Sequence, residues 1–86
     1  MKTIYKYPFP HGMDTAAIEM HRGAVVRRVA MQGDALCIWA EVDSADLKSV
    51  RHFRIVGTGH EIPENGHYLG SCDDDPLVWH VIEIVG

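Results

Sequence analysis

The alternation of apolar and polar residues is clearest at the centre of the chain, where two such runs flank a short polar connection. The runs cover residues 24–32 and 35–42, and Gly33-Asp34 joins them. A period of two is typical of strands, and two such runs around a tight glycine-containing connection are typical of a β-hairpin. The centre of the chain is therefore predicted to be a pair of antiparallel strands.

The two predicted hairpin strands differ in how cleanly their faces separate. The second strand has a wholly apolar face, predicted to enter the core, made of Leu36, Ile38, Ala40 and Val42. Its opposite face carries Cys37, Trp39 and Glu41. In the first strand, strict alternation places Val25, Val29 and Met31 with Arg27, and Val26 and Ala30 with Arg28. Both faces of the first strand are therefore predicted to be mixed.

Further short strands are predicted on both sides of this hairpin, at residues 3–7, 16–20, 50–56, 67–72 and 77–85. Segment 16–20 is also compatible with a single helical turn, although a strand is favoured, and residues 43–49 are predicted to form a loop or one helical turn. Six or seven strands without a long helical period predict a mainly β fold, either a small antiparallel sandwich or a partly open barrel. No linker divides the chain, so residues 1–86 are predicted to form one domain.

The predicted last strand is apolar on both faces, since Trp79 and Val81 alternate with Val78, Ile82 and Ile84. Such a strand is expected either at the centre of a two-layer core or at a subunit contact. Because a chain of 86 residues buries only a modest share of its surface, homo-oligomerisation is left open.

Composition and charge exclude several functions. The chain is 47% hydrophobic with a formal net charge of −4, which favours folding and disfavours nonspecific binding to nucleic acid. No apolar run approaches the ~20 residues of a membrane span, so no membrane partner is expected. Cys37 and Cys72 lack a paired spacing and no apolar leader opens the chain, so free thiols and a cytoplasmic location are expected.

No catalytic or cofactor motif stands out. The six histidines include no pair with the spacing of helical zinc ligands, so neither a metal nor another cofactor is expected. No nucleophile can be matched with a base and a stabilising group, which favours a protein that is not an enzyme. The most suggestive segment is Gly57-Thr58-Gly59-His60, whose glycines could present backbone amides to an anion. It lacks the lysine of a phosphate loop and the third glycine of a dinucleotide fingerprint, and a purely structural turn is favoured.

Four segments carry a resemblance that covers nearly the whole chain: Thr3-Ile4-Tyr5-Lys6-Tyr7, Leu36-Cys37-Ile38-Trp39-Ala40, Phe53-Arg54-Ile55-Val56-Gly57-Thr58-Gly59-His60 and Leu77-Val78-Trp79-His80-Val81. In order and separation they resemble an uncharacterised family of small phage and prophage proteins. The resemblance implies a phage-related origin and an action inside the bacterial host cell, and it implies no enzyme activity.

Small phage accessory proteins commonly bind and block a host factor, so the first hypothesis is a non-enzymatic inhibitor of a host defence protein, of anti-CRISPR type. The candidate protein-binding residues are Arg27, Arg28 and Trp39 on the hairpin, and Asp73, Asp74 and Asp75, which could mimic phosphate charge. Two alternatives remain: an oligomer that sequesters an anionic nucleotide signal at residues 57–60, and a structural or assembly protein of the phage particle.

Overall fold

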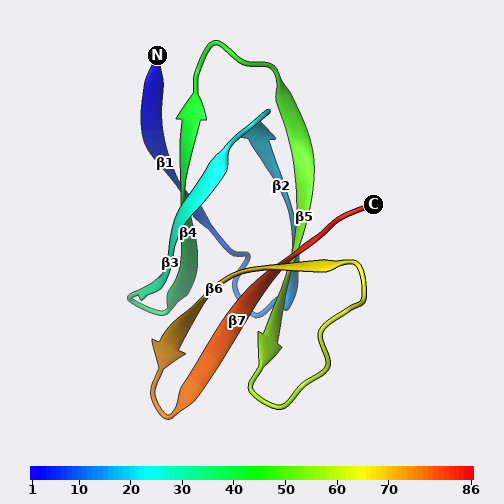
Figure 1. Ribbon diagram of the computed structural model, residues 1–86. Coiled ribbons are helices and arrows are strands. Elements are labelled where there is room, and N and C mark those ends of the chain that lie inside the picture. The colour runs from blue at the N-terminus through cyan, green and yellow to red at the C-terminus, as the bar shows by residue number, and fades with distance from the viewer.

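Seven strands form two antiparallel sheets in the computed structural model, which describes residues 1–86 (Figure 1). One sheet has the strand order β1-β4-β3 and the other the order β2-β5-β7-β6. The strands are β1 Lys2–Pro8, β2 Thr15–His21, β3 Val25–Gln32, β4 Ala35–Asp43, β5 Lys48–Gly57, β6 Gly66–Asp74 and β7 Leu77–Ile84. The predicted mainly β fold is confirmed as a sandwich of two open sheets without any helix. No helix is therefore available that could cross a membrane.

Three connections carry the chain from one sheet to the other, at residues 9–14, 22–24 and 44–47. The predicted central hairpin is present as β3 and β4, and segment 16–20 is part of a strand, β2. The sheets lie closest where β3 packs against β6. A long connection, residues 58–65, then carries the chain from β5 past β7 to the edge strand β6.

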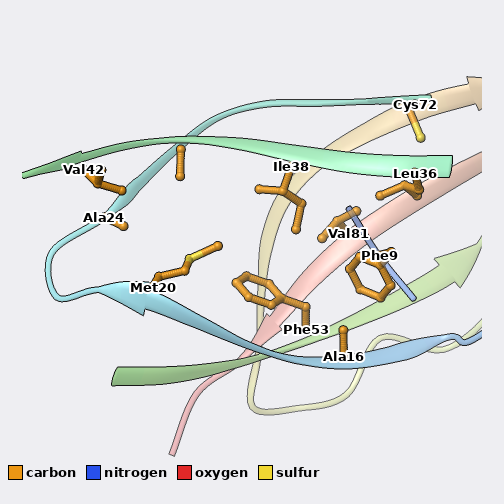
Figure 2. Packing of buried hydrophobic residues seen from close by; sticks show 11 residues of the cluster. Phe9, Ala16, Met20, Ala24, Leu36, Ile38, Val42, Phe53, Cys72 and Val81 are labelled. Carbon is orange, nitrogen blue, oxygen red and sulfur yellow. The ribbon is translucent and has the colours of Figure 1, made fainter. Parts of the chain in front are cut away.

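The core lies between the sheets and is centred on the face of β4 that alternation predicts. Its residues Leu36, Ile38, Ala40 and Val42 are all at most 6% exposed. Figure 2 shows Ile38 pointing from β4 into the space that Met20 and Phe53 of the opposite sheet fill. Each such fully buried side chain contributes about 1.5–3 kcal/mol relative to an exposed one. The alternating pattern of β4 therefore identifies the largest single contribution to the core.

The predicted division of β3 into two mixed faces is wrong, because β3 contains a β-bulge. Val26 lies opposite Ala40 and Arg28 lies opposite Trp39, so Arg27 is an extra residue in the ladder. A bulge shifts every following side chain by one position. Val26 therefore joins Val29 and Met31 in packing against the core, while both arginines lie on the opposite face.

β7 takes the first of its two predicted arrangements, at the centre of its sheet between β5 and β6. Val81 and Ile82 point to opposite faces, and both are 0% exposed. Val81 belongs to the core between the sheets, whereas Ile82 lies beneath the connection 58–65. A Cβ atom at Gly66 would meet Ile82 Cγ2 at 2.6 Å and Ile62 Cγ2 at 3.2 Å, so only glycine allows this close approach. The connection thus covers Ile82 on the second apolar face of β7.

Both cysteines are free and buried, as the sequence predicts. Cys72 belongs to the core cluster, and burial raises the pKa of its thiol above the usual range, with smaller contributions from the charges of Asp74 and Asp73. The uncharged thiol is a poor nucleophile, so Cys72 acts as a small apolar core residue.

Candidate functional site

The outer face of the three-stranded sheet carries a row of side chains that crosses all three strands. Trp39 lies on the central strand β4 and points away from the core, since its neighbours Ile38 and Ala40 point into it. In the register of the sheet, Lys6 of β1 is opposite Trp39 on one side and Arg28 of β3 is opposite it on the other. We call these three residues the basic row.

Arg28 is held against the tryptophan. Its guanidinium carbon lies 5.7 Å from the centre of the Trp39 ring, within the range of a cation–π interaction. Trp39 itself is only partly buried, so the ring and the cation are both open to solvent. On the other side Lys6 Nζ donates a hydrogen bond to Gln32 Oε1 at 2.7 Å.

In a neighbouring row on the same face, two cations share one carboxylate, that of Glu41. Because the bulge turns Arg27 to the outer face, its Nη2 and Nε donate to Glu41 Oε1 at 2.9 and 3.2 Å. Lys2 Nζ lies 3.9 Å from the other carboxylate oxygen of Glu41. Neither Lys6 nor Arg28 has a carboxylate within 4.0 Å. Lys6 and Arg28, the neighbours of Trp39 in the register of the sheet, are therefore the two cations of this face without a carboxylate partner.

The structure brings together Arg27, Arg28 and Trp39 of the predicted binding residues, and it adds Lys6. No local sequence signal identifies Lys6, because its place beside Trp39 depends on the pairing of β1 with β4, more than thirty residues further along the chain. The bulge at Arg27 is likewise not identified by the local sequence, because it depends on how β3 pairs with β4. Without it, one of the two arginines would point into the core.

The acidic run Asp73-Asp74-Asp75 lies elsewhere, at the β6–β7 hairpin of the four-stranded sheet. It does not present one continuous charged surface, because Asp73 and Asp74 point to opposite sides of β6. Asp74 Oδ2 accepts a hydrogen bond from the Trp79 indole Nε1 at 3.1 Å. Asp74 is therefore tied to the inner side of the hairpin, and the run is not part of the basic row.

The segment Gly57-Thr58-Gly59-His60 forms a tight turn at the end of β5. The His60 amide donates to the Gly57 carbonyl at 3.1 Å, and Gly59 has a φ of +88°, which favours glycine at this position of the turn. Thr58 Oγ1 lies 3.1 Å from His80 Nε2, and Tyr68 Oη lies 2.8 Å from His80 Nδ1. This geometry agrees with the favoured structural turn, and anion binding here stays a prediction.

The structure also contains a partly buried ion pair that the sequence did not indicate. Arg51 donates from Nε and Nη2 to the two carboxylate oxygens of Glu83, at 2.7 Å each, and from Nη1 to the Ala24 carbonyl at 2.6 Å. The hydrogen bond to Glu83 raises the pKa of Arg51. This pair connects β5, β7 and the entry to β3, and so has a structural role.

The fold and these contacts define a small all-β sandwich domain with one exposed face centred on a tryptophan between two cations. Residues 1–85 match the family described as a domain of unknown function, DUF7352, and the chain belongs to that family. This agrees with the expected membership of an uncharacterised family. No curated protein and no solved structure matches the chain.

Proposed function

We propose that this protein is a phage- or prophage-encoded, non-enzymatic binding protein that inhibits a bacterial defence factor by direct contact, with the basic row at the centre of that contact. The observation that carries the proposal is the pair of unpaired cations, Lys6 and Arg28, on both sides of the partly exposed Trp39. The phage setting rests on the resemblance of the four sequence segments, and the anti-CRISPR type of action rests on analogy with small phage accessory proteins that block a host factor.

The composition of the row favours a protein partner. Tryptophan and arginine are the residues most enriched among those that dominate binding energy at protein interfaces. Arg28 already makes a cation–π contact with Trp39, so less side-chain entropy is lost when a partner covers the pair. The face belongs to a three-stranded antiparallel sheet, whose paired strands hold the backbone of these residues in place.

The positive charges of Lys6 and Arg28 determine which groups a partner needs at the contact. Burying Lys6 and Arg28 without counter-charges would be unfavourable, so the contacting surface should provide carboxylates close to both. Nucleic acid fits less well, because electrostatic binding to it depends on the number of phosphates that lysines and arginines neutralise. This face offers two free cations on a chain of net charge −4.

The proposal is tested by capturing partners from bacterial lysate with the wild type and two charge-reversal variants. Arg28→Glu reverses the charge of the cation that contacts the Trp39 ring. Arg54→Glu is the matched control, because Arg54 is also exposed on a strand, has no carboxylate within 4.0 Å and lies on the outer face of the other sheet. An identified defence protein should co-purify in stoichiometric amount with the wild type and with Arg54→Glu, and be lost with Arg28→Glu.

Native mass spectrometry of the purified protein distinguishes the two alternative functions, sequestration of a nucleotide and a structural role in the phage particle. A stoichiometric nucleotide that is lost on mutation of Thr58 or His60 would favour sequestration at the β5 turn and contradict a protein-binding role for the row. A large assembly of this chain alone would favour a structural protein of the phage particle. Retention of one defence protein by wild type and Arg28→Glu alike would show that the contact lies elsewhere.

A further inference from the structure

A pocket of about 400 Å³ opens at one end of the sandwich, away from the basic row. Three connections meet there: the β1–β2 loop, the β3–β4 hairpin and the β6–β7 hairpin. Figure 1 shows both hairpins toward the lower left of the view. The pocket volume lies in the range of clefts that hold small organic ligands, which is about 300–1,000 Å³.

The inner wall of the pocket is apolar and continues the core. Phe9 and Leu36 are buried, with Phe9 beside Val81 and Leu36 above it in Figure 2. Met31, Ile55 and Trp79 complete this wall and are only partly buried, so part of their apolar surface faces the pocket. A ligand with an apolar body would remove this surface from water.

Three carboxylates line the pocket, those of Asp14, Asp34 and Asp74. His11 is the other titratable group of the lining, and no lysine or arginine belongs to it. None of the three carboxylates forms an ion pair. No group of three or more His, Cys, Asp or Glu in the structure is arranged to hold a metal ion, so the acidic side chains surround an apolar space instead of converging on one point.

We propose that this pocket binds a small organic cation, an ammonium or guanidinium group carried on an apolar body. The apolar body would lie against Leu36, Met31 and Trp79, and the charge would be shared by Asp34 and Asp74. The Trp79 indole adds a cation–π surface beside Asp74, which its Nε1–H already holds in place. The site is independent of the basic row, which has the opposite charge and lies on the outer face of the three-stranded sheet, whereas the pocket is lined by residues of both sheets.

The two tryptophans provide a direct test, since Trp79 lines the pocket and Trp39 belongs to the basic row. Each gives one indole N–H signal in an NMR spectrum of the full chain, and Trp39→Phe assigns them. Titration with phenethylamine should shift the Trp79 signal saturably and leave the Trp39 signal in place. Phenethyl alcohol has nearly the same shape without the charge. It should bind at least about tenfold more weakly than phenethylamine.

Variants of the acidic residues test which carboxylates bind the ammonium group of the ligand. Asp34→Asn with Asp74→Asn keeps the shape of the pocket and keeps an amide oxygen that can accept from Trp79 Nε1, and should weaken phenethylamine binding about tenfold. Asp73→Asn is the matched control, because Asp73 is adjacent in sequence and points to the other side of β6. Asp34 lies on an exposed turn, so Asp34→Asn alone should fold even if the double variant does not. This single variant should weaken phenethylamine binding about threefold.

Three results would overturn the proposal. The amine could leave the Trp79 signal unmoved, the alcohol could bind as tightly as the amine, or the folded Asp34→Asn variants could bind like the wild type. None of these results bears on the basic row, whose own test depends on Arg28 and a protein partner.

Discussion

Arg51 and Glu83 are joined by two parallel hydrogen bonds of 2.7 Å on the inner side of the four-stranded sheet. Their side chains are 22% and 17% exposed, so the pair is partly desolvated. Through Arg51 Nη1 the pair also holds the Ala24 carbonyl, just before β3. Removing one partner leaves the other poorly solvated and unpaired, which costs more than the loss of a surface ion pair.

We therefore expect Glu83→Gln to lower the free energy of unfolding by about 2 kcal/mol. Glu19→Gln is the control, because its pair with Lys48 is exposed and 4.0 Å long, and should change stability by less than about 0.5 kcal/mol. Urea denaturation of both variants measures the difference. Equal effects would show that the Arg51–Glu83 pair behaves as an ordinary surface contact.

The bulge in β3 gives a prediction about chain length. Deleting Arg27 removes the extra residue, so Val26, Arg28 and Val29 keep their partners on β4. The variant should fold with a free energy of unfolding within about 1 kcal/mol of the wild type, apart from the lost contact to Glu41. Deleting Ala30 instead shifts Met31 to the outer face, and is expected to destabilise by about 2–5 kcal/mol. Similar stability of the two deletions would contradict the register.

The core prediction concerns two residues of β5. Phe53 is 1% exposed between the sheets, and its replacement by alanine should cost about 3–5 kcal/mol. Val50, three residues earlier, is 54% exposed, and Val50→Ala should cost less than about 1 kcal/mol. Thermal and urea unfolding compare the two, and a small effect at Phe53 would mean that the core is not packed as described.

Asp43 makes stability depend on pH at the acidic end. The Ala45 amide donates to its carboxylate at 3.1 Å and the N-terminal ammonium of Met1 lies 3.0 Å away, and the first of these contributes most to lowering the pKa of Asp43 below its model-peptide value of 3.8. A depressed folded pKa stabilises the fold above the unfolded pKa, and this contribution is lost as pH falls through the folded pKa. Unfolding midpoints should therefore fall as the pH is lowered below about 4, and less steeply in Asp43→Asn. Identical pH dependence of the unfolding midpoint in the wild type and Asp43→Asn would show that Asp43 does not contribute to the loss of stability in acid.

Features of the fold that depend on residues close together in the sequence could be predicted, and features that depend on distant strand pairing could not. The β3–β4 hairpin and the inward face of β4 follow from alternation around Gly33-Asp34, and both are present. The bulge at Arg27 is invisible to alternation, because it appears only when β3 is aligned with β4. Lys6 and the Arg51–Glu83 pair depend on contacts across more than thirty residues. The candidate binding residues Arg28 and Trp39 could therefore be named from the sequence, but their common face and the position of Lys6 beside them could not.

Phage infection of bacterial cells tests whether the basic row is needed to inhibit a defence factor. Phage plating is measured on strains carrying single, defined defence systems, with the wild-type protein, Arg28→Glu or Arg54→Glu expressed at equal level. We predict that the wild type and Arg54→Glu restore plating against the same defence system, and that Arg28→Glu does not. Restoration by all three proteins alike, or by none of them in any strain, would contradict a defence inhibitor that acts through the row of Lys6, Trp39 and Arg28.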